Sequence, residues 1–346
     1  MGLNVTGRYR YPDPKPAWLE LLEEETLEPA LPIVDAHHHL WEEPGNRYLL
    51  EDLLVDVACG HNLVATVFVQ CHFGYRTSGP EQLRPVGETE RIEAFRRQGE
   101  RERPRSRLCA GIVGFADLLA GDGIDEVLDA HFAAAPGYFC GVRQSFARDS
   151  HFPDGIVLRP APAGMSADPR FRQALRRIAR RGLCFDAMLY HEQIPELTYL
   201  AREVDEATIV LDHFGCPLGV GHYQGREADT FAAWRRDIRA LAECPNVHVK
   251  LGGLGMVVTG AQWHLKDLPP SSTELAAAWR PWFDVCLEAF GTRRCLFESN
   301  FPVDKAMYSY QVLWNAFKRL AECASAAEKA DLFKNTAARL YSLTLP

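Results

Sequence analysis

The residues best suited to metal binding or catalysis form a run of three histidines, His37-His38-His39, which follows Asp35 closely. The run ends an apolar segment, residues 33–39, whose length and composition are typical of a β-strand. Successive strand side chains point to opposite faces, which predicts Asp35, His37 and His39 on one face and His38 on the other. Two neutral imidazoles spaced in this way can hold one zinc or similar divalent ion between them.

Two more histidines end apolar segments further along the chain. His213 lies where the run 208–213 meets a glycine and a proline, which predicts a position at the carboxyl end of a strand. His191 follows the run 183–189, and an imidazole with a pKa of about 6.5 can accept a proton at neutral pH. We therefore expect both histidines to be catalytic residues.

Groups suited to binding a substrate also follow the apolar runs, and they are Gln70, Arg143, Lys250 and the aromatic Tyr190. An arginine matches a carboxylate with two parallel hydrogen bonds, whereas a lysine acts as a point charge. A buried cation needs a partner, so Arg143 and Lys250 indicate an anionic ligand. The alternative for both is a salt bridge to Asp186 or Glu298 inside the protein.

The elements that must position these residues alternate along the chain. The expected strands are residues 33–39, 64–71, 109–115, 139–146, 183–189, 208–213, 247–251 and 295–298. Amphipathic helical patterns separate them, as parallel strands require, and the runs are apolar enough to be covered on both faces. Eight such units predict a closed (β/α)8 TIM barrel. The alternative is an open doubly wound sheet, but no G-x-G-x-x-G follows the first strand to favour it.

The length of 346 residues fits one barrel domain, residues 31–346, with an N-terminal extension, residues 1–30. Two segments are too long for ordinary connections, 147–168 after the fourth strand and 258–273 after the seventh. Loops that follow barrel strands surround the active site, so we expect both segments to lie at the mouth.

The charge balance excludes several classes of partner. Acidic residues number 46 against 38 basic ones, which gives a net charge of −8 and argues against nucleic acid as a ligand. No apolar stretch approaches the roughly 18 residues of a membrane span, and the N-terminus lacks the apolar core of a signal peptide. The ten cysteines include no C-x-x-C pair. These features predict a cytoplasmic protein with reduced thiols.

Three motifs carry a resemblance to a known family, and they are IVDAHHHLW at 33–41, LDHFGCP at 211–217 and VKLGGLG at 249–255. Together they are similar to the amidohydrolase-2 branch of the amidohydrolase superfamily. The resemblance implies a TIM barrel and a lactonase-like hydrolase. It matches His37 and His39 to the histidine pair of the first strand and His213 to the histidine that ends the sixth. It also implies one divalent metal, zinc or manganese, held by these three residues.

The eighth strand departs from the family pattern. Asn300 replaces the aspartate that the superfamily uses to activate water, and a neutral amide cannot take a proton at neutral pH. We expect Asp304 to supply the base instead, with Glu298 and His191 as alternatives. The change also leaves two mechanisms open, one with a divalent ion and one in which the histidines act without a metal.

Three functions are compatible with these residues. The leading interpretation is a hydrolase that opens a small carboxylated or hydroxylated lactone by attack of water at the barrel mouth. The second is a decarboxylase of an aromatic or unsaturated acid, which needs no base for water. The third is a barrel that binds a ligand without turning it over, for which Asn300 is the argument. The expected partner is a small anionic substrate, and the sequence allows a homo-oligomer.

Overall fold

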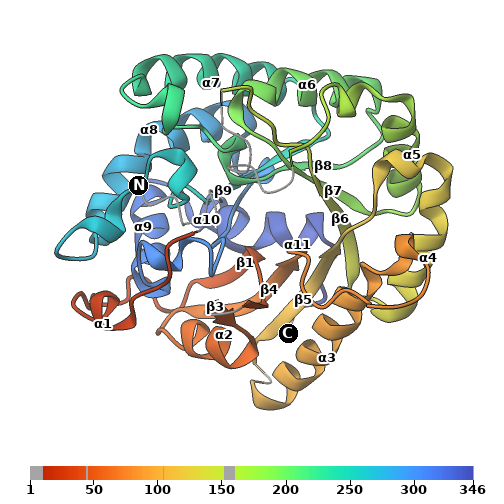
Figure 1. Cartoon of the computed structure of the whole chain (residues 1–346). Helices are drawn as coiled ribbons and strands as arrows, with labels where there is room; N and C mark the ends of the chain where they lie inside the picture. The colour runs from red at the N-terminus through yellow and green to blue at the C-terminus, as the bar shows by residue number, and fades with distance from the viewer. Residues whose placement is uncertain (1–10, 44–45, 104, 152–159, 346) are drawn as a thin grey trace.

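A computed structural model describes residues 11–43, 46–103, 105–151 and 160–345 of the chain. Its main sheet has eight parallel strands in the order β1, β4, β5, β6, β7, β8, β9, β10, which confirms the predicted barrel (Figure 1). Their bounds are β1 Pro32–His38, β4 Asn62–Val69, β5 Arg107–Gly114, β6 Phe139–Ser145, β7 Cys184–Met188, β8 Ile209–Leu211, β9 Val247–Leu251 and β10 Cys295–Phe297. Each strand matches one of the eight apolar runs of the sequence.

A layer of helices surrounds the strands (Figure 1). The bounds are α1 Pro16–Leu19, α2 Leu50–Val57, α3 Val86–Glu102, α4 Ile124–Ala134, α5 Pro169–Arg180, α6 Ile194–Glu203, α7 Glu227–Ala242, α8 Ser272–Phe290, α9 Tyr310–Leu320, α10 Ala326–Ala330 and α11 Thr336–Leu340. Local signals fix several of the starts. Asp168 caps α5 just before Pro169, and Ser271 with Glu274 forms a capping box at α8. No helix among the described residues is long and apolar enough to cross a membrane.

The first and last strands meet through their carboxyl ends. The backbone N–H of His39 donates to the carbonyl of Phe301 at 2.7 Å, and that of Asn300 donates to the carbonyl of His37 at 2.9 Å. This seam brings the histidine run beside the residues that follow β10. The fold therefore assembles the two ends of the candidate site directly from the backbone.

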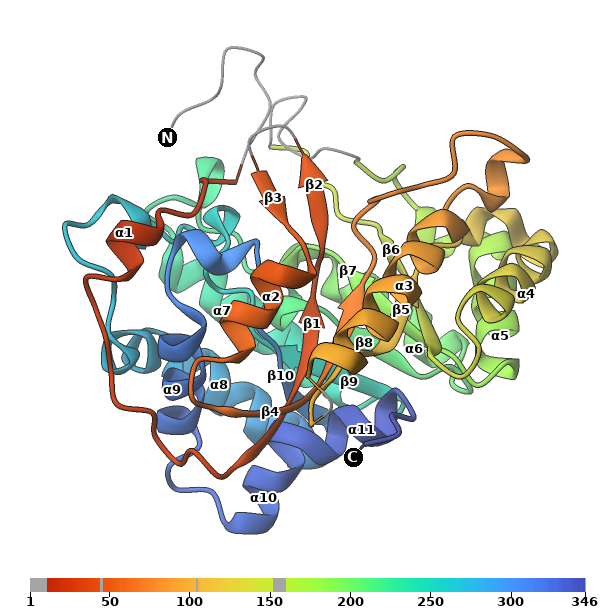
Figure 2. The same ribbon diagram turned by 90° about the horizontal axis from the view of Figure 1, so that it is seen from below.

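The opposite end of the barrel is filled from the C-terminal part of the chain. Val34 and Ala36 of β1 pack in a cluster with Ala337 and Tyr341, which belong to or follow α11. Figure 2 shows α10 and α11 at this end and the hairpin of β2 (Trp41–Glu43) and β3 (Asn46–Tyr48) at the other. All ten cysteines are free thiols, as the sequence predicts.

One expectation about the first strand is wrong. Asp35 does not share a face with His37. Between Asp35 and His38, two residues of β1 oppose one residue of β4, and this β-bulge changes the alternation of faces. The carboxylate of Asp35 instead accepts hydrogen bonds from Ser299 and from Tyr310 of α9.

The segments outside the regular units lie as follows. Of the loop 147–168, residues 152–159 are outside the described part; the loop follows β6 and leads into α5. The loop 258–273 is joined to the β8 loop by the Gly219 N–H, which donates to the Val258 carbonyl at 2.9 Å. Residues 1–10 of the expected extension also lie outside the described residues. Its following part contacts α8 and α9 through Glu24, which accepts from the Ser272 N–H and the Asn315 amide.

Candidate active site

His37 and His39 meet at the mouth end of β1. Their Nε2 atoms are 3.1 Å apart, and both side chains are buried. His39 is oriented by its Nδ1, which lies 2.7 Å from the carbonyl of Val69 in β4. A carbonyl can only accept, so Nδ1 carries the hydrogen and Nε2 presents a lone pair. His38 points to the other side, where its Nε2 lies 2.8 Å from the hydroxyl of Thr66.

His213 joins this pair from the strand on the far side of the barrel. It follows β8 with φ of 55°, a left-handed conformation that is uncommon for a residue with a side chain. Its ring centroid lies 4.7 Å from that of His37. The neighbouring Gly253 makes this possible, because a Cβ there would lie 2.7 Å from His213. The structure thus brings together the three histidines that the sequence predicts.

Below the histidines lies a buried group of charges. The Lys250 ammonium is 2.6 Å from Asp186 and 3.0 Å from Asp212, and all three side chains are fully buried. Tyr341 donates to Asp186 from the closed end at 2.9 Å. The carboxylates raise the pKa of Lys250 and so keep it charged. Lys250 therefore forms the salt bridge with Asp186 that the sequence offers as an alternative to a bound anion. A direct contact of Lys250 with substrate stays a prediction.

Arg143 lies closer to the mouth of the barrel than Lys250. Its Nε lies 3.1 Å from Asp212 and its Nη1 donates to the Gln70 carbonyl at 3.1 Å. Its side chain is 12% exposed, whereas Lys250 is fully buried, so Arg143 is the cation that reaches toward the mouth. Among the described residues, the side-chain oxygen of Gln70 has no hydrogen-bond partner. Tyr190 packs nearby in a separate mouth cluster with Cys216.

Asn300 and Asp304 form a pair at the end of β10. The Asn300 amide donates to Asp304 Oδ1 at 3.1 Å, and Asp304 Oδ2 accepts from the Gly255 N–H at 3.1 Å and the Tyr308 hydroxyl at 2.6 Å. Burial raises the pKa of Asp304 to about 7 despite these hydrogen bonds. A carboxyl group with such a pKa is suited to exchange protons at neutral pH.

His191 lies apart from the three histidines that converge. It starts the turn before α6, where its Nδ1 accepts from the Leu218 N–H at 3.3 Å and its ring packs against Tyr223. These contacts belong to the loop after β8. Its catalytic role stays a prediction that the contacts do not support.

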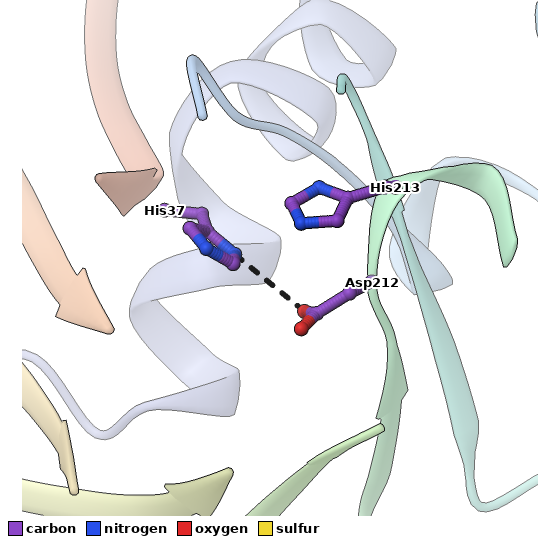
Figure 3. Close-up of side chains that lie close together, drawn as sticks. All are labelled: His37, Asp212 and His213. Atoms are coloured by element: carbon purple, nitrogen blue, oxygen red, sulfur yellow. Dashed lines mark ion pairs between the residues drawn. The ribbon is translucent and has the colours of Figure 1, made fainter. Parts of the chain in front are cut away.

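The donor set at the centre fits a divalent metal ion. His37, Asp212 and His213 each offer a ligand atom, and these atoms lie within 4.8 Å of one another (Figure 3). Burial lowers the pKa of His37 to about 4 and that of His39 well below its usual value. Both rings are therefore neutral at pH 7, which is the form that binds metals. The two Nε2 atoms of His37 and His39 also have the spacing of two ligands on one ion with bonds of about 2.1 Å.

Comparison with known proteins identifies the family of the chain. A sequence profile of the family Amidohydro_2, described as amidohydrolase, matches residues 34–343. The chain belongs to this amidohydrolase family. The family resemblance of the three sequence motifs is thereby confirmed.

The amidohydrolase is similar to proteins of known sequence and structure. It is 32% identical over 332 residues to the uncharacterized protein y4mH of Sinorhizobium fredii, which covers 89% of this chain and 98% of that protein. It is 32% identical over 180 residues to an L-fucono-1,5-lactonase of Burkholderia multivorans, covering 52% of this chain and 58% of the lactonase. A crystal structure of an amidohydrolase from B. multivorans with bound zinc superposes with a TM-score of 0.67 at 25% identity, covering 90% and 99% of the two chains.

Two residues of this amidohydrolase site were not predicted from the sequence. Asp212 directly precedes His213 and lies 3.5 Å from His37 Nδ1, and its place in the motif beside His213 is the signal that could have drawn attention to it. Tyr11 packs into the mouth cluster of Tyr190 and Cys216. Burial raises the pKa of Tyr11 to about 12, with Arg143 among the charges it faces. No pattern around Tyr11 in the sequence marks it, because its neighbours along the chain are polar and proline-rich.

Glu88 of α3 supports the segment after β4 and gives a prediction of pH dependence. Its Oε1 accepts from the N–H groups of Cys71 and Phe73 at 2.9 and 2.7 Å, and burial raises its pKa from 4.5 to about 7. Between these values the folded state keeps a proton that the unfolded state loses, so stability falls as the pH rises through this window. In Glu88→Gln, we expect the loss of unfolding free energy between pH 5 and 8 to be smaller by roughly 2–3 kcal/mol.

Urea unfolding at several pH values measures this difference. Glu90→Gln is the matched control, because Glu90 lies on the same helix with its side chain 47% exposed. The control is expected to follow the pH dependence of the parent. A Glu88→Gln curve parallel to that of the parent would show that the carboxyl group is already ionised in the folded protein at low pH.

Proposed function

We propose that this amidohydrolase hydrolyses a small carboxylated or hydroxylated lactone. The observation that carries the proposal is the meeting of three buried histidines, His37, His39 and His213, at the mouth of the barrel beside Arg143. The similarity to an L-fucono-1,5-lactonase supports the same reaction class, and we therefore choose 1,5-lactones as the first substrates to test.

In the proposed reaction, water adds to the lactone carbonyl and the ring C–O bond breaks. Asp304 accepts the proton of the attacking water, since its pKa of about 7 lets it do so at neutral pH, and returns it to the ring oxygen as that bond opens. Arg143 orients an anionic or hydroxyl group of the substrate from the mouth. When bound by the histidines, a zinc or manganese ion would polarise the carbonyl and lower the pKa of water.

Metal analysis and activity after chelation test the proposal together. Protein purified without added ions is expected to hold about one zinc or manganese ion per chain. Removing the ion with a chelator is expected to abolish ring opening, and adding it back is expected to restore activity. The readout is proton release from a panel of sugar lactones with and without a carboxylate. Full activity of the metal-free protein would contradict the role of the ion and favour histidines acting alone.

Product analysis separates the proposal from its two competitors. Release of carbon dioxide from an aromatic or unsaturated acid, without opening of any lactone, would identify a decarboxylase instead. Saturable binding of a lactone without turnover would identify a ligand-binding barrel. In that last case Asn300→Asp is the informative variant, because a gain of activity would show that the missing aspartate is what the parent lacks.

A further inference from the structure

The buried carboxylate of Glu298 lies between two of the three histidines. Its Oε1 is 2.7 Å from Nδ1 of His213, and its Oε2 is 3.0 Å from Nδ1 of His37. The backbone N–H of His213 also donates to Oε1, at 3.2 Å. Only the contact with His213 has hydrogen-bond geometry in the structure, and Oε2 is a buried oxygen that no described residue satisfies with a hydrogen bond. One side chain from the end of β10 thus lies within 3.0 Å of two histidines that come from opposite sides of the barrel.

Such a contact decides which nitrogen of an imidazole can bind a ligand. An acceptor at Nδ1 holds the hydrogen there and leaves the lone pair on Nε2. His39 obtains this orientation from the Val69 carbonyl. We propose that Glu298 is a positioning residue that accepts the Nδ1 hydrogens of both His37 and His213, so that all three histidines present Nε2 to one metal ion. The proposal rests on the metal site of the proposed function but not on its substrate.

The packing around Glu298 supports a dedicated position for this side chain. A Cβ at Gly252 of the β9 loop would lie 2.4 Å from Glu298 Cγ, so a residue with a side chain at 252 would displace the carboxylate. Asn300 cannot do the same task, since its amide is directed to Asp304. The family pattern has a carboxylate at the position of Asn300, and in this chain Glu298 supplies a carboxylate to the site from two residues earlier.

Lys250 competes with Glu298 for the same atom. Its ammonium also lies 3.0 Å from His37 Nδ1. If Lys250 donated there, His37 would carry its hydrogen on Nε2 and direct it at Nε2 of His39, 3.1 Å away. In that arrangement Lys250, His37 and His39 form a continuous chain of hydrogen bonds, and His37 has no lone pair at Nε2 with which to bind the ion. The two arrangements place the His37 hydrogen on different nitrogens, so they can be told apart.

Zinc affinity in Glu298→Gln tests the proposal. One amide oxygen can accept from one imidazole but its NH2 group cannot accept from the other, so we expect zinc to bind about 10- to 100-fold more weakly. Competition with a chromophoric chelator measures the affinity without any substrate. Glu88→Gln is the matched control, a buried Glu→Gln change on the outer layer that is expected to leave zinc affinity unchanged.

Nitrogen-15 spectra of the histidines in the zinc-loaded parent provide a second measurement that does not depend on the variant folding. We expect Nδ1–H and zinc-bound Nε2 for His37 and His213. Unchanged zinc affinity in Glu298→Gln, zinc bound to Nδ1 of His37, or a parent that binds no zinc would each overturn the proposal. Weakened zinc binding in a protein that opens no lactone would leave it standing while the proposed function fails.

Discussion

Replacement of Lys250 by methionine is expected to lower the free energy of unfolding by about 3–5 kcal/mol. The ammonium is fully buried and lies 2.6 Å from Asp186 and 3.0 Å from Asp212. Without it, Asp186 keeps the neutral Tyr341 hydroxyl and Asp212 keeps Arg143. Breaking a buried ion pair from one side costs more than the pair contributes, because the remaining charge stays desolvated.

Chemical unfolding at pH 7.5 or so measures this loss, with Lys266→Met as the control. Lys266 is 52% exposed and 3.7 Å from Glu274, and a change there is expected to stay within about 0.5 kcal/mol of the parent. Burial also raises the pKa of Asp186 to about 6. At a pH below this value the carboxylate is neutral, and we expect a smaller difference in unfolding free energy between the variant and the parent. A deficit below about 1 kcal/mol at pH 7.5 would contradict the charge arrangement described for the barrel interior.

Replacement of His39 by asparagine is expected to reduce kcat/KM by about three orders of magnitude, equivalent to ~4 kcal/mol of transition-state stabilisation. The amide nitrogen of asparagine can take over the hydrogen bond of His39 Nδ1 to the Val69 carbonyl, but it supplies nothing in place of Nε2. The variant therefore tests the ligand atom and not the local fold. Bound zinc, measured on the same samples, is expected to fall together with activity.

The adjacent residue offers a matched control. His38→Gln changes the neighbouring histidine of the same run, and a glutamine amide can reach the Thr66 hydroxyl that His38 Nε2 contacts. Because His38 points away from His37 and His39, its variant is expected to keep metal and activity at some cost in stability. Equal losses in the two variants would show that the run acts through the fold and not through a ligand set.

The sequence predicts the barrel because most residues of its strands are buried, so that the strands appear as short, mainly apolar runs. It also predicts the convergence of His37, His39 and His213, since side chains at the carboxyl ends of parallel strands meet at one mouth. The displacement of Asp35 could not be foreseen. The bulge that turns it away depends on how β1 pairs with β4, which is a property of two strands and not of one.

The contacts of the histidines could not be predicted from single segments, although Glu298 and the motif that contains Asp212 can be recognised in the sequence. Asp212 becomes part of the site because His37 lies 3.5 Å from it across the barrel. Glu298 can take its position because Gly252 has no Cβ, which would lie 2.4 Å from Glu298 Cγ. Tyr11 reaches the mouth from a part of the chain without strong periodicity. Each of these contacts joins elements that are distant in sequence, so propensity and spacing carry no information about them.

The seam between β1 and the end of β10 also bears on how the protein acquires its activity. Ser299 binds Asp35 across 264 positions of sequence, and the contacts of Glu298 with the first histidine cross the same seam. Contacts of such long range close late in folding, because the chain entropy that they cost is repaid only when the intervening units are in place. A fragment that ends before β10 would carry all three histidines and yet lack the carboxylate that we propose to orient His37 and His213. Tight metal binding is therefore expected only after the barrel has closed, and any partly folded species is expected to bind zinc more weakly.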